Sequence, residues 1–347
     1  LLNPGTIFND DPDCFVSSMK PLPLTDPKVD KCIECGFCEV NCVSCGLTLS
    51  ARQRIVAQRE ISRLRRDGSD PDRLKALEKE FVYYGRETCA GDGLCSTSCP
   101  MKINTADLIH DVRERQLSKT GKKLGKWAAE HLGGVSDGLR LMLGAADTAH
   151  TLLGNHGVDR IGAVLHKAGL PLWNSALPKP FNGAKLADSE PAPKRVVYFP
   201  SCINRTMGVS EEAGRKLQPL AEVFVNLCKK AGFQVIFPKN MDGLCCGMIW
   251  ESKGMPDIAD GKTAELEAAL AVASEGGTIP VVCDQSPCLH RMRDHIKSMP
   301  LYEPAEFILD FLAPHLKFNR IDTPIAVHIT CSSRRMGLAG KIIELAS

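Results

Sequence analysis

The sequence predicts two architectures in one chain: a helical α+β domain built around cysteine loops, and then an α/β domain with a mostly parallel sheet. Three observations support this. Cysteines crowd the first hundred residues and return only at Cys202. Helical periodicity dominates from Leu47 to about residue 168. After the proline-rich stretch 171–193, short β-branched runs alternate with helical patterns, which is typical of parallel strands covered on both faces.

The 16 cysteines are the most informative feature of the composition. They are clustered in a long chain that opens without a secretory signal, and this favours metal binding over disulfides. The net charge of +2 gives no argument for a nucleic-acid partner. No apolar run reaches the roughly 18–20 residues that span a bilayer. We therefore expect a cytoplasmic protein, or one held peripherally on the cytoplasmic face of the inner membrane.

The first half is predicted to be helical between its cysteine loops. Residues 1–30 are rich in proline and turn residues, and we expect an extended arm there. The helical pattern from Leu47 to Tyr84 is broken at 68–71. Asn104 or Thr105 is expected to cap the next helix. Residues 119–168 indicate further helices, interrupted at the paired glycines 133–134.

The second half alternates strands and helices. Strands are predicted at 195–200, 234–238, 279–284 and 325–330, and helices at 211–231, 257–273 and 304–316. The segments 198–208 and 327–337 share a Cys, an Arg, a Met and a Gly at equal spacing. Each is expected to follow a strand and to precede a helix. We interpret them as the starts of two copies of one α/β unit.

The first cysteine motif is a C-x2-C-x2-C-x3-C run, which is typical of bacterial ferredoxins. Its two-residue spacers curl the backbone so that three sulfurs point to one cube, and Gly36 relieves crowding there. The fourth cysteine of such a run ligates the other cluster. The second motif has the same frame, with Asp92 where the second cysteine would stand.

We therefore expect two iron–sulfur clusters. The first is assigned to Cys32, Cys35, Cys38 and Cys99. The second is assigned to Cys42, Cys89, Cys95 and Asp92. Because a carboxylate is a harder ligand than a thiolate, this second site is expected to be an Asp-ligated [4Fe–4S] or a [3Fe–4S] cluster. Cys45 is left open as an alternative ligand. Structural zinc is the competing interpretation, but it prefers two separated C-x2-C pairs.

The third motif is a vicinal cysteine pair before a glycine, with single cysteines on either side. The candidate ligands of a further cluster are Cys202, Cys245, Cys246 and Cys288, with Cys283 as an additional candidate. A vicinal pair can place two thiolates on one metal centre, form a redox-active disulfide, or simply pack in a core. Cys228 lies on an apolar helix face and is expected in the core, and Cys14 is given no role.

Two basic helical segments, around residues 52–66 and 113–123, are interpreted as solvated faces. The alternative is docking to anionic lipid or to an acidic redox partner. His290, His295 and His328 have no ligand-like spacing and are expected to be structural.

The two cysteine loops followed by CCG units resemble the iron–sulfur half of FAD-linked D-lactate dehydrogenases. The same layout is similar to the iron–sulfur component of glycolate oxidase and to that of anaerobic glycerol-3-phosphate dehydrogenase. The CCG unit itself resembles the CCG-containing component of heterodisulfide reductase. The opening LLNPGTIF (1–8) looks like the end of a FAD-linked oxidase domain, and GLCCGMIWESKG (243–254) also looks typical of the D-lactate enzymes.

The resemblance implies electron relay from FAD, in a domain before Leu1, towards a quinone or a cytochrome. It also implies a division into 1–30 (linker), 31–118 (two-cluster ferredoxin-like domain), 119–194 (helical segment and linker), 195–320 (first CCG unit) and 321–347 (start of a truncated second unit). Two departures matter: the second unit lacks its CCG, and Val43 replaces a proline. A component of a disulfide or quinone reductase and a zinc-stabilised interaction module are the alternative functions.

Overall fold

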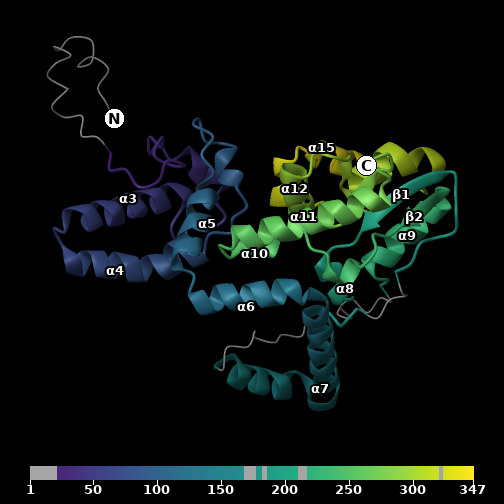
Figure 1. Cartoon of the computed structure of the whole chain (residues 1–347), viewed down its shortest axis with the longest axis horizontal. Coiled ribbons are helices and arrows are strands. Elements are labelled where there is room, and N and C mark those ends of the chain that lie inside the picture. Colours follow the sequence, from purple (N-terminus) through teal and green to yellow (C-terminus); the bar gives the residue numbers. More distant parts are fainter. Residues whose placement is uncertain (1–21, 168–176, 182–185, 210–216, 320–322) are drawn as a thin grey trace, which may run out of the picture. The chain divides into compact units, whose positions relative to one another are not determined.

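The structure is a computed structural model of the chain. It describes residues 22–167, 177–181, 186–209, 217–319 and 323–347. The opening LLNPGTIF segment and Cys14 lie outside the described residues. The chain forms two compact units, residues 1–113 and 114–347, which are considered separately below (Figure 1). The finer division into five segments stays a prediction.

The first unit is helical. Its elements are η1 (Phe37–Asn41), α3 (Ala51–Asp67), α4 (Pro71–Phe81), η2 (Val82–Glu87), η3 (Leu94–Ser96) and α5 (Thr105–Gln116). Helix α3 ends and α4 begins where the glycine, aspartate and proline residues of the sequence predict. Gly68 takes the left-handed conformation that closes α3, Asp70 caps α4, and Pro71 occupies its first turn. At α5, the Asn104 side chain accepts a hydrogen bond from the Ala106 amide at 3.1 Å.

The core of this unit lies between α3, α4 and α5. Ile55, Phe81 and Leu108 are among its buried residues, and the partly buried Cys32, Cys89 and Cys99 pack against it. Residues before the first cysteine loop join the same core, because Val29 is fully buried. Thus the segment just before Cys32 is packed and not extended, at least over the described part of the expected arm.

The second unit combines helices with one sheet. It contains α6 (Lys119–Glu130), α7 (Leu132–Lys167), β1 (Lys194–Phe199), α8 (Cys202–Thr206), α9 (Leu220–Lys230), β2 (Phe233–Ile236), η4 (Met241–Gly243), α10 (Met248–Ser252), α11 (Pro256–Ala273), β3 (Val281–Cys283), α12 (Ser286–His295), β4 (Leu301–Tyr302), α13 (Pro304–Phe307), η5 (Ile308–Leu312), η6 (Ala313–His315), α14 (Cys331–Arg335) and α15 (Ala339–Ala346).

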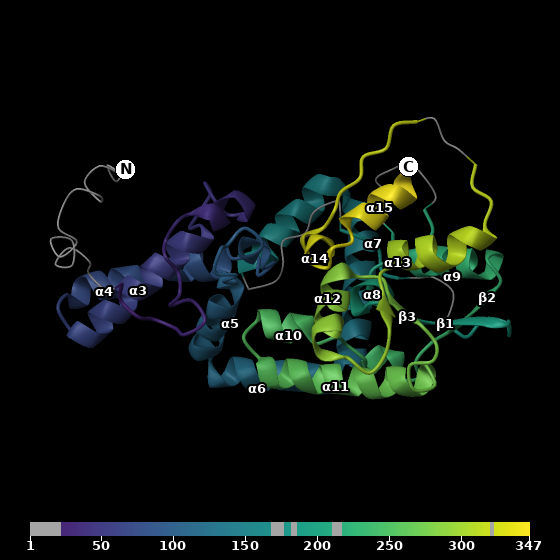
Figure 2. The same cartoon turned by 90° about the horizontal axis from the view of Figure 1, so that it is seen from above.

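The four strands are parallel, in the order β2-β1-β3-β4. Alternate side chains enter two separate cores. Val197 and Val281 face Leu266 and Leu270 of α11. Val196 and Val282 face Phe224 of α9 and Phe307 of α13. Figure 2 shows the strands between α11 on one side and α9 with α13 on the other. The predicted parallel sheet, covered on both faces, is therefore confirmed.

The expectation of a strand at 325–330 is wrong. Residues 323–330 form no strand, and Ile325 is 64% exposed, whereas β4 takes the place beside β3. A β-branched run becomes a strand only with a neighbour that accepts its backbone hydrogen bonds. The expected interruption of the stretch 119–168 lies at His131, between α6 and α7, two residues before the paired glycines, which themselves lie in the first turn of α7. The backbone of α7 leaves helical geometry again at Gly154. Glycine weakens a helix by about 1 kcal/mol, which does not by itself end one.

The proposed internal repeat has a structural counterpart. Both α8 and α14 are five-residue helices that begin at a cysteine, Cys202 and Cys331. A hydroxyl side chain caps each helix. Ser201 accepts a hydrogen bond from the Asn204 amide, and Thr330 accepts one from the Ser333 amide. Only the first copy follows a strand.

Candidate functional site

The first cysteine loop is shaped by two residues with positive φ. Glu34 has φ 59° and Gly36 has φ 86°. The left-handed Gly36 begins the short helix η1, which carries Cys38. This conformation turns the Glu34 amide towards the Cys32 sulfur, to which it donates a hydrogen bond. The loop therefore encloses its sulfurs with backbone donors, as an anionic metal cluster requires.

The second loop repeats this geometry. Gly93 has φ 69° and begins the short helix η3, which carries Cys95. Asp92, directly before Gly93, occupies the turn that Cys35 occupies before Gly36. One of its carboxylate oxygens accepts a hydrogen bond from the Leu94 amide at 3.1 Å. The negative charge of Asp92 raises the pKa of the Cys95 thiol, although burial and the charge of Cys89 raise it more.

The two loops pack against each other through η1 and η3. Asn41 joins them by donating hydrogen bonds to the hydroxyls of Thr97 and Ser98, at 3.1 and 2.5 Å. Burial, and then the neighbouring sulfurs of Cys95 and Cys32, raise the pKa of Cys38 to about 11.

Sulfur also lies near sulfur within each candidate set. Burial raises the pKa of Cys32, and the charge of Cys99 adds a smaller increase. At Cys95, burial is again the largest cause, and the nearby Cys89 raises the pKa further. The structure thus brings Cys32 near Cys99, and Cys95 near Cys89.

Helix N-termini supply further donors. The amides of Ala51 and Arg52, in the first turn of α3, donate to the sulfurs of Cys42 and Cys38 respectively. The Thr105 amide at the start of α5 donates to the Cys95 sulfur at 3.4 Å. The partial positive charge of a helix N-terminus stabilises an anionic sulfur.

The thiolate of Cys42 is stabilised by its surroundings. Burial opposes ionisation, but it is outweighed. The Ser44 hydroxyl and amide, the Ala51 amide and the charge of Arg54 together lower the pKa of Cys42 below its ordinary value. The sulfur lies 3.3 Å from the Ser44 hydroxyl and 3.7 Å from an Arg54 nitrogen.

Two arginines of α3 correct the expectation of a solvated basic face. Arg54 is 1% exposed and Arg59 is 2% exposed. Arg59 donates to the Cys32 carbonyl at 3.0 Å and pairs with Glu34 at 2.5 Å. Both arginines lie on the buried stripe of α3, three and eight residues after Ala51. Residues at this spacing share one face of an α-helix with Ala51. The spacing could therefore have predicted that both arginines are buried.

Other cysteines behave differently. Cys45, the alternative ligand, is exposed, as is Cys35. Cys228 is fully buried in the core of the second unit, and burial alone raises its pKa to about 12, so the core prediction is confirmed. All the described cysteines are free thiols.

In the second unit, cysteines from three segments meet. Cys202 begins α8, Cys245 and Cys246 precede α10, and Cys288 lies in α12. Their thiols form a hydrogen-bonded chain, from Cys202 to Cys245 to Cys246 to Cys288. Cys283, at the end of β3, is fully buried, and its thiol is close enough to feel the charges of Cys246 and Cys202.

The thiols of this group are held neutral. The contact with Cys245, followed by burial, raises the pKa of Cys202. At Cys245 the hydrogen bond with Cys202 lowers the pKa, but the Cys246 contact and burial outweigh it and raise the pKa to about 12. Near neutral pH these buried thiols carry their protons, so binding of a metal as thiolates would release protons.

Gly247 explains why glycine follows the vicinal pair. Its φ is 87°, and a Cβ at this position would lie 2.3 Å from the Ala259 carbonyl oxygen of α11. Its amide donates to the Cys245 sulfur at 3.4 Å. The residue therefore allows the loop to pass against α11 while directing an amide to the sulfur.

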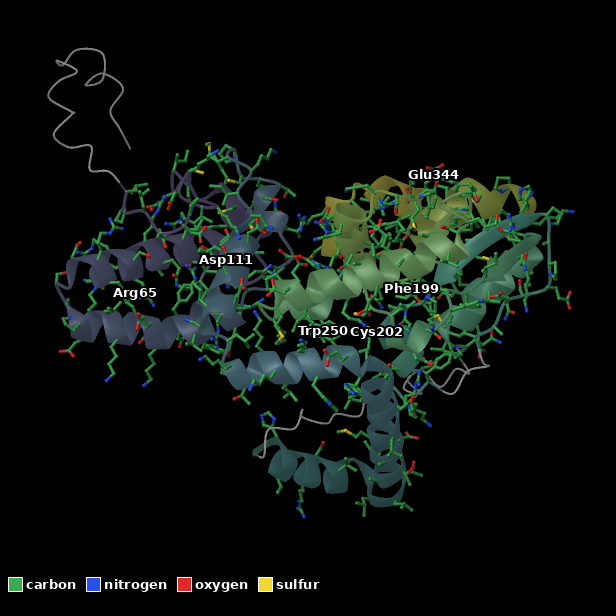
Figure 3. The ribbon with its side chains drawn as sticks, in the orientation of Figure 1. Arg65, Asp111, Phe199, Cys202, Trp250 and Glu344 are labelled. Atoms are coloured by element: carbon green, nitrogen blue, oxygen red, sulfur yellow. The ribbon has the colours of Figure 1, made fainter. Side chains whose placement is uncertain are left out.

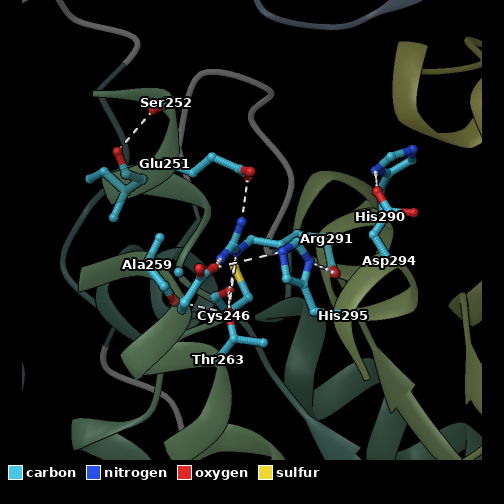
Figure 4. A network of polar contacts seen from close by, with 12 residues as sticks. Cys246, Glu251, Ser252, Ala259, Thr263, His290, Arg291, Asp294 and His295 are labelled. Carbon is cyan, nitrogen blue, oxygen red and sulfur yellow. Dashed lines mark hydrogen bonds and ion pairs between the residues drawn. The ribbon is translucent and has the colours of Figure 1, made fainter. Parts of the chain in front are cut away.

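Arg291 of α12 also contacts this turn (Figure 4). Its guanidinium donates to the Cys246 carbonyl at 3.0 Å and forms ion pairs with Glu251 at 2.7 Å and Asp260 at 2.6 Å. Because these two carboxylates compensate the buried positive charge, Arg291 fixes the position of the vicinal pair without leaving an unpaired cation beside it.

An apolar cavity of about 310 Å³ adjoins these sulfurs. Cys202 and Cys245 form part of its wall, together with apolar side chains of α6, α7 and α10, among them Leu139 and Ile249. Trp250 also lines it and is anchored by a hydrogen bond from its indole nitrogen to the Gly125 carbonyl at 3.0 Å. Cys202 and Trp250, both labelled in Figure 3, line this one cavity.

The donor set suits iron–sulfur clusters. Thiols predominate, amides point to several of them, and glycines occupy the tight turns. In the described part of the chain, no three His, Cys, Asp or Glu side chains are gathered as the ligands of a single metal ion would be. In a cluster each thiolate binds its own iron, so the sulfurs need not converge on one point.

Comparison with known proteins identifies the first cysteine loops. Residues 28–103 match the 4Fe-4S dicluster domain family, and they form a ferredoxin-type domain of that kind. No curated protein and no solved structure matches the chain. Among the helices that the structure describes, none combines the length and apolarity needed to cross a bilayer.

Proposed function

We propose that this chain is the iron–sulfur electron-transfer part of a FAD-linked dehydrogenase for D-lactate or a related D-2-hydroxy acid. The observation that carries the electron-transfer role is the dicluster domain at residues 28–103, whose sulfurs are met by backbone amides. The clusters supply one-electron redox chemistry when bound. The protein positions them and adjusts their potentials.

One cluster is assigned to Cys32, Cys35, Cys38 and Cys99, and the other to Cys42, Cys89, Cys95 and Asp92. Support comes from the proximity of Cys32 to Cys99 and of Cys95 to Cys89 and Asp92. A third cluster is assigned to Cys202, Cys245, Cys246 and Cys288, with Cys283 as a further candidate ligand. Their hydrogen-bonded chain of thiols supports this assignment.

The proposed electron donor is a FAD-linked oxidase domain. Exposed apolar side chains around the first cysteine loop would suit contact with such a partner: Ile33, Phe37, Val40, Val43 and Leu47. Cys35 is exposed in the same loop, which would bring a cluster close to a docked donor. The proposed acceptor is a quinone or a cytochrome, reached by peripheral contact with the membrane.

Metal analysis tests this function. Iron, acid-labile sulfide and EPR spectra would be measured on anaerobically purified protein, before and after dithionite. We expect about seven or eight irons from the ferredoxin-type sites, more if the CCG cysteines also hold a cluster, and a [3Fe–4S] or Asp-ligated signal from the second site. Zinc in a colourless protein without a signal would overturn the proposal and favour a metal-stabilised interaction module.

The cavity favours a second candidate, a quinone or disulfide reductase with catalysis at the CCG cysteines. Its apolar wall would suit a ring-shaped acceptor, and two of the sulfurs line it. The test is reoxidation of dithionite-reduced protein by a water-soluble quinone. The candidate requires Cys245→Ser to abolish reoxidation while the ferredoxin-type sites still become reduced. Cys228→Ser, in the other core, is the control. Unchanged reoxidation in C245S excludes catalysis there.

A further inference from the structure

Buried arginines of the described chain differ in how their charges are compensated. The set comprises Arg54, Arg59, Arg205 and Arg291, none more than 4% exposed. Three of them have a carboxylate within 4.0 Å. Arg59 pairs with Glu34, Arg205 with Asp242, and Arg291 with Glu251 and Asp260.

Arg54 differs from the rest. No described carboxylate lies within 4.0 Å of it, and its contacts are with neutral oxygens and one sulfur. It donates to the Gly85 carbonyl at 2.7 Å and to the hydroxyls of Ser44 and Thr88, at 2.9 and 3.2 Å. The remaining contact is with the Cys42 sulfur, at 3.7 Å.

A buried cation without an anion is unfavourable, because few solvent dipoles remain to stabilise it. Among its contacts, only the sulfur of Cys42 can carry a full negative charge. It would do so as the thiolate ligand of a cluster. The positive charge of Arg54 is therefore compensated only when an anionic centre is bound at Cys42.

We propose that Arg54 is the counter-charge of the cluster bound by Cys42, and that it holds the reduction potential of this cluster above that of the cluster bound by Cys32. This inference rests on the proposed function. It adds a property of the two sites that the motif alone does not contain.

The direction follows from electrostatics. Reduction adds one negative charge to a cluster, and a nearby buried cation stabilises the reduced form more than the oxidised form. At the Cys32 site the corresponding arginine, Arg59, is neutralised by Glu34 at 2.5 Å. The net protein charge beside Cys32 is then close to zero, whereas beside Cys42 it is positive.

The test is a redox titration of each cluster, followed by its own EPR signal, in anaerobically purified protein. Arg54→Gln removes the charge and keeps a polar side chain. At the wild-type midpoint of the Cys42 cluster, we expect its ratio of reduced to oxidised form to fall about tenfold, which is about 59 mV for a one-electron couple. The Cys32 cluster should not shift. Arg63→Gln, on the exposed part of α3, is the matched control.

Two further variants separate charge from shape. Arg54→Lys keeps the charge and should keep the wild-type potential. Glu34→Gln leaves Arg59 uncompensated and should raise the potential of the Cys32 cluster, the reverse of the effect of R54Q at the other site. Iron content of every variant shows which clusters are present.

An unchanged Cys42-cluster potential in R54Q would overturn the inference. If R54Q loses the cluster, R54K decides: a retained cluster with the wild-type potential supports the counter-charge, and loss in both variants shows a steric role and overturns it. Wild-type protein without iron would instead refute the proposed function, and the inference with it.

Discussion

Gly247 fixes the backbone directly after the vicinal cysteines. Two independent constraints act there: a positive φ, and the Ala259 carbonyl oxygen at 2.3 Å from the position of any Cβ. The neighbouring carbonyl belongs to helix α11 and cannot move as the end of a flexible side chain could. A substitution at this residue must therefore shift the loop, and the cysteines with it.

We expect Gly247→Ala to lower the free energy of unfolding of the second unit by about 2–4 kcal/mol, from backbone strain and overpacking. Gly243→Ala is the control in the same loop, since its Cβ would meet nothing within 4 Å, and it should change stability by at most about 0.5 kcal/mol. Urea unfolding followed by tryptophan fluorescence measures this, because all three tryptophans lie beyond residue 113. Equal losses in both variants would contradict the steric argument.

In the proposed ligand set, Asp92 stands at one corner of the second ferredoxin-type site. Asp92→Cys would complete the four-thiolate pattern, and we expect it to replace a [3Fe–4S] or Asp-ligated signal by that of an ordinary [4Fe–4S] cluster. Asp92→Asn, a weaker ligand, should favour the three-iron form. EPR spectra and iron content check both variants. Identical wild-type and D92C spectra would rule out Asp92 as the residue at this corner.

The N-terminus of α3 links an ordinary helix cap to the site. Ser50 caps the helix by accepting a hydrogen bond from Gln53, and the Gln53 side chain accepts one from the Ser50 amide in return. The first turn so fixed carries the amides that donate to Cys42 and Cys38. A cap is usually a matter of stability alone, but here it also orients donors towards sulfur.

Ser50→Ala should destabilise the first unit by about 1 kcal/mol and lower its retention of iron. Ser118→Ala removes the cap of α6, where the hydroxyl accepts from the Gly121 amide. Ser118→Ala should lower the free energy of unfolding of the second unit by a similar amount, without loss of iron from the first unit. Thermal unfolding and iron content after gel filtration compare the two. Equal iron retention in both would show that the cap of α3 has no influence on the site.

Elements with strong local signals were predictable, and those that depend on distant partners were not. The boundary between α3 and α4 follows from Gly68, Asp70 and Pro71, each of which acts locally. The run at 325–330 looks like a strand, yet it forms none because pairing is a tertiary property.

The candidate site divides in the same way. Its cysteines were evident from spacing, whereas Arg54 and Arg59 were assigned to a solvated face on charge alone. Their burial depends on which side of α3 faces the core. Arg291 was not singled out, since its carboxylate partners come from α10 and α11 and no motif joins them.

At the scale of the whole molecule, each unit has its own hydrophobic core, and alkaline pH should affect the second through its buried thiols. Cys228 is the simplest case, because burial alone raises its pKa from 9.0 to about 12. Its contribution to stability is complete below pH 9, where the unfolded thiol is also protonated. The contribution is lost as pH rises from 9 towards 12.

By pH 10 this loss should reach about 1 kcal/mol. Cys228→Ala removes the titrating group and leaves every other thiol in place. The stability advantage of the wild type over C228A should therefore shrink by this amount between pH 7 and pH 10. Urea unfolding at the two pH values measures the difference. An advantage that does not change with pH would contradict the linkage.

Helix α3 contacts both ends of the first cysteine loop through arginines five residues apart: Arg54 at the Cys42 sulfur and Arg59 at the Cys32 carbonyl. Five residues advance an α-helix by about 7.5 Å. The helix thus fixes the spacing between the two ends of the loop, which in the proposed assignment carry ligands of different clusters. Inserting one residue between the two arginines would rotate one of them away from its loop. If the clusters are held as proposed, the rate of electron exchange between them would then change although every ligand is retained.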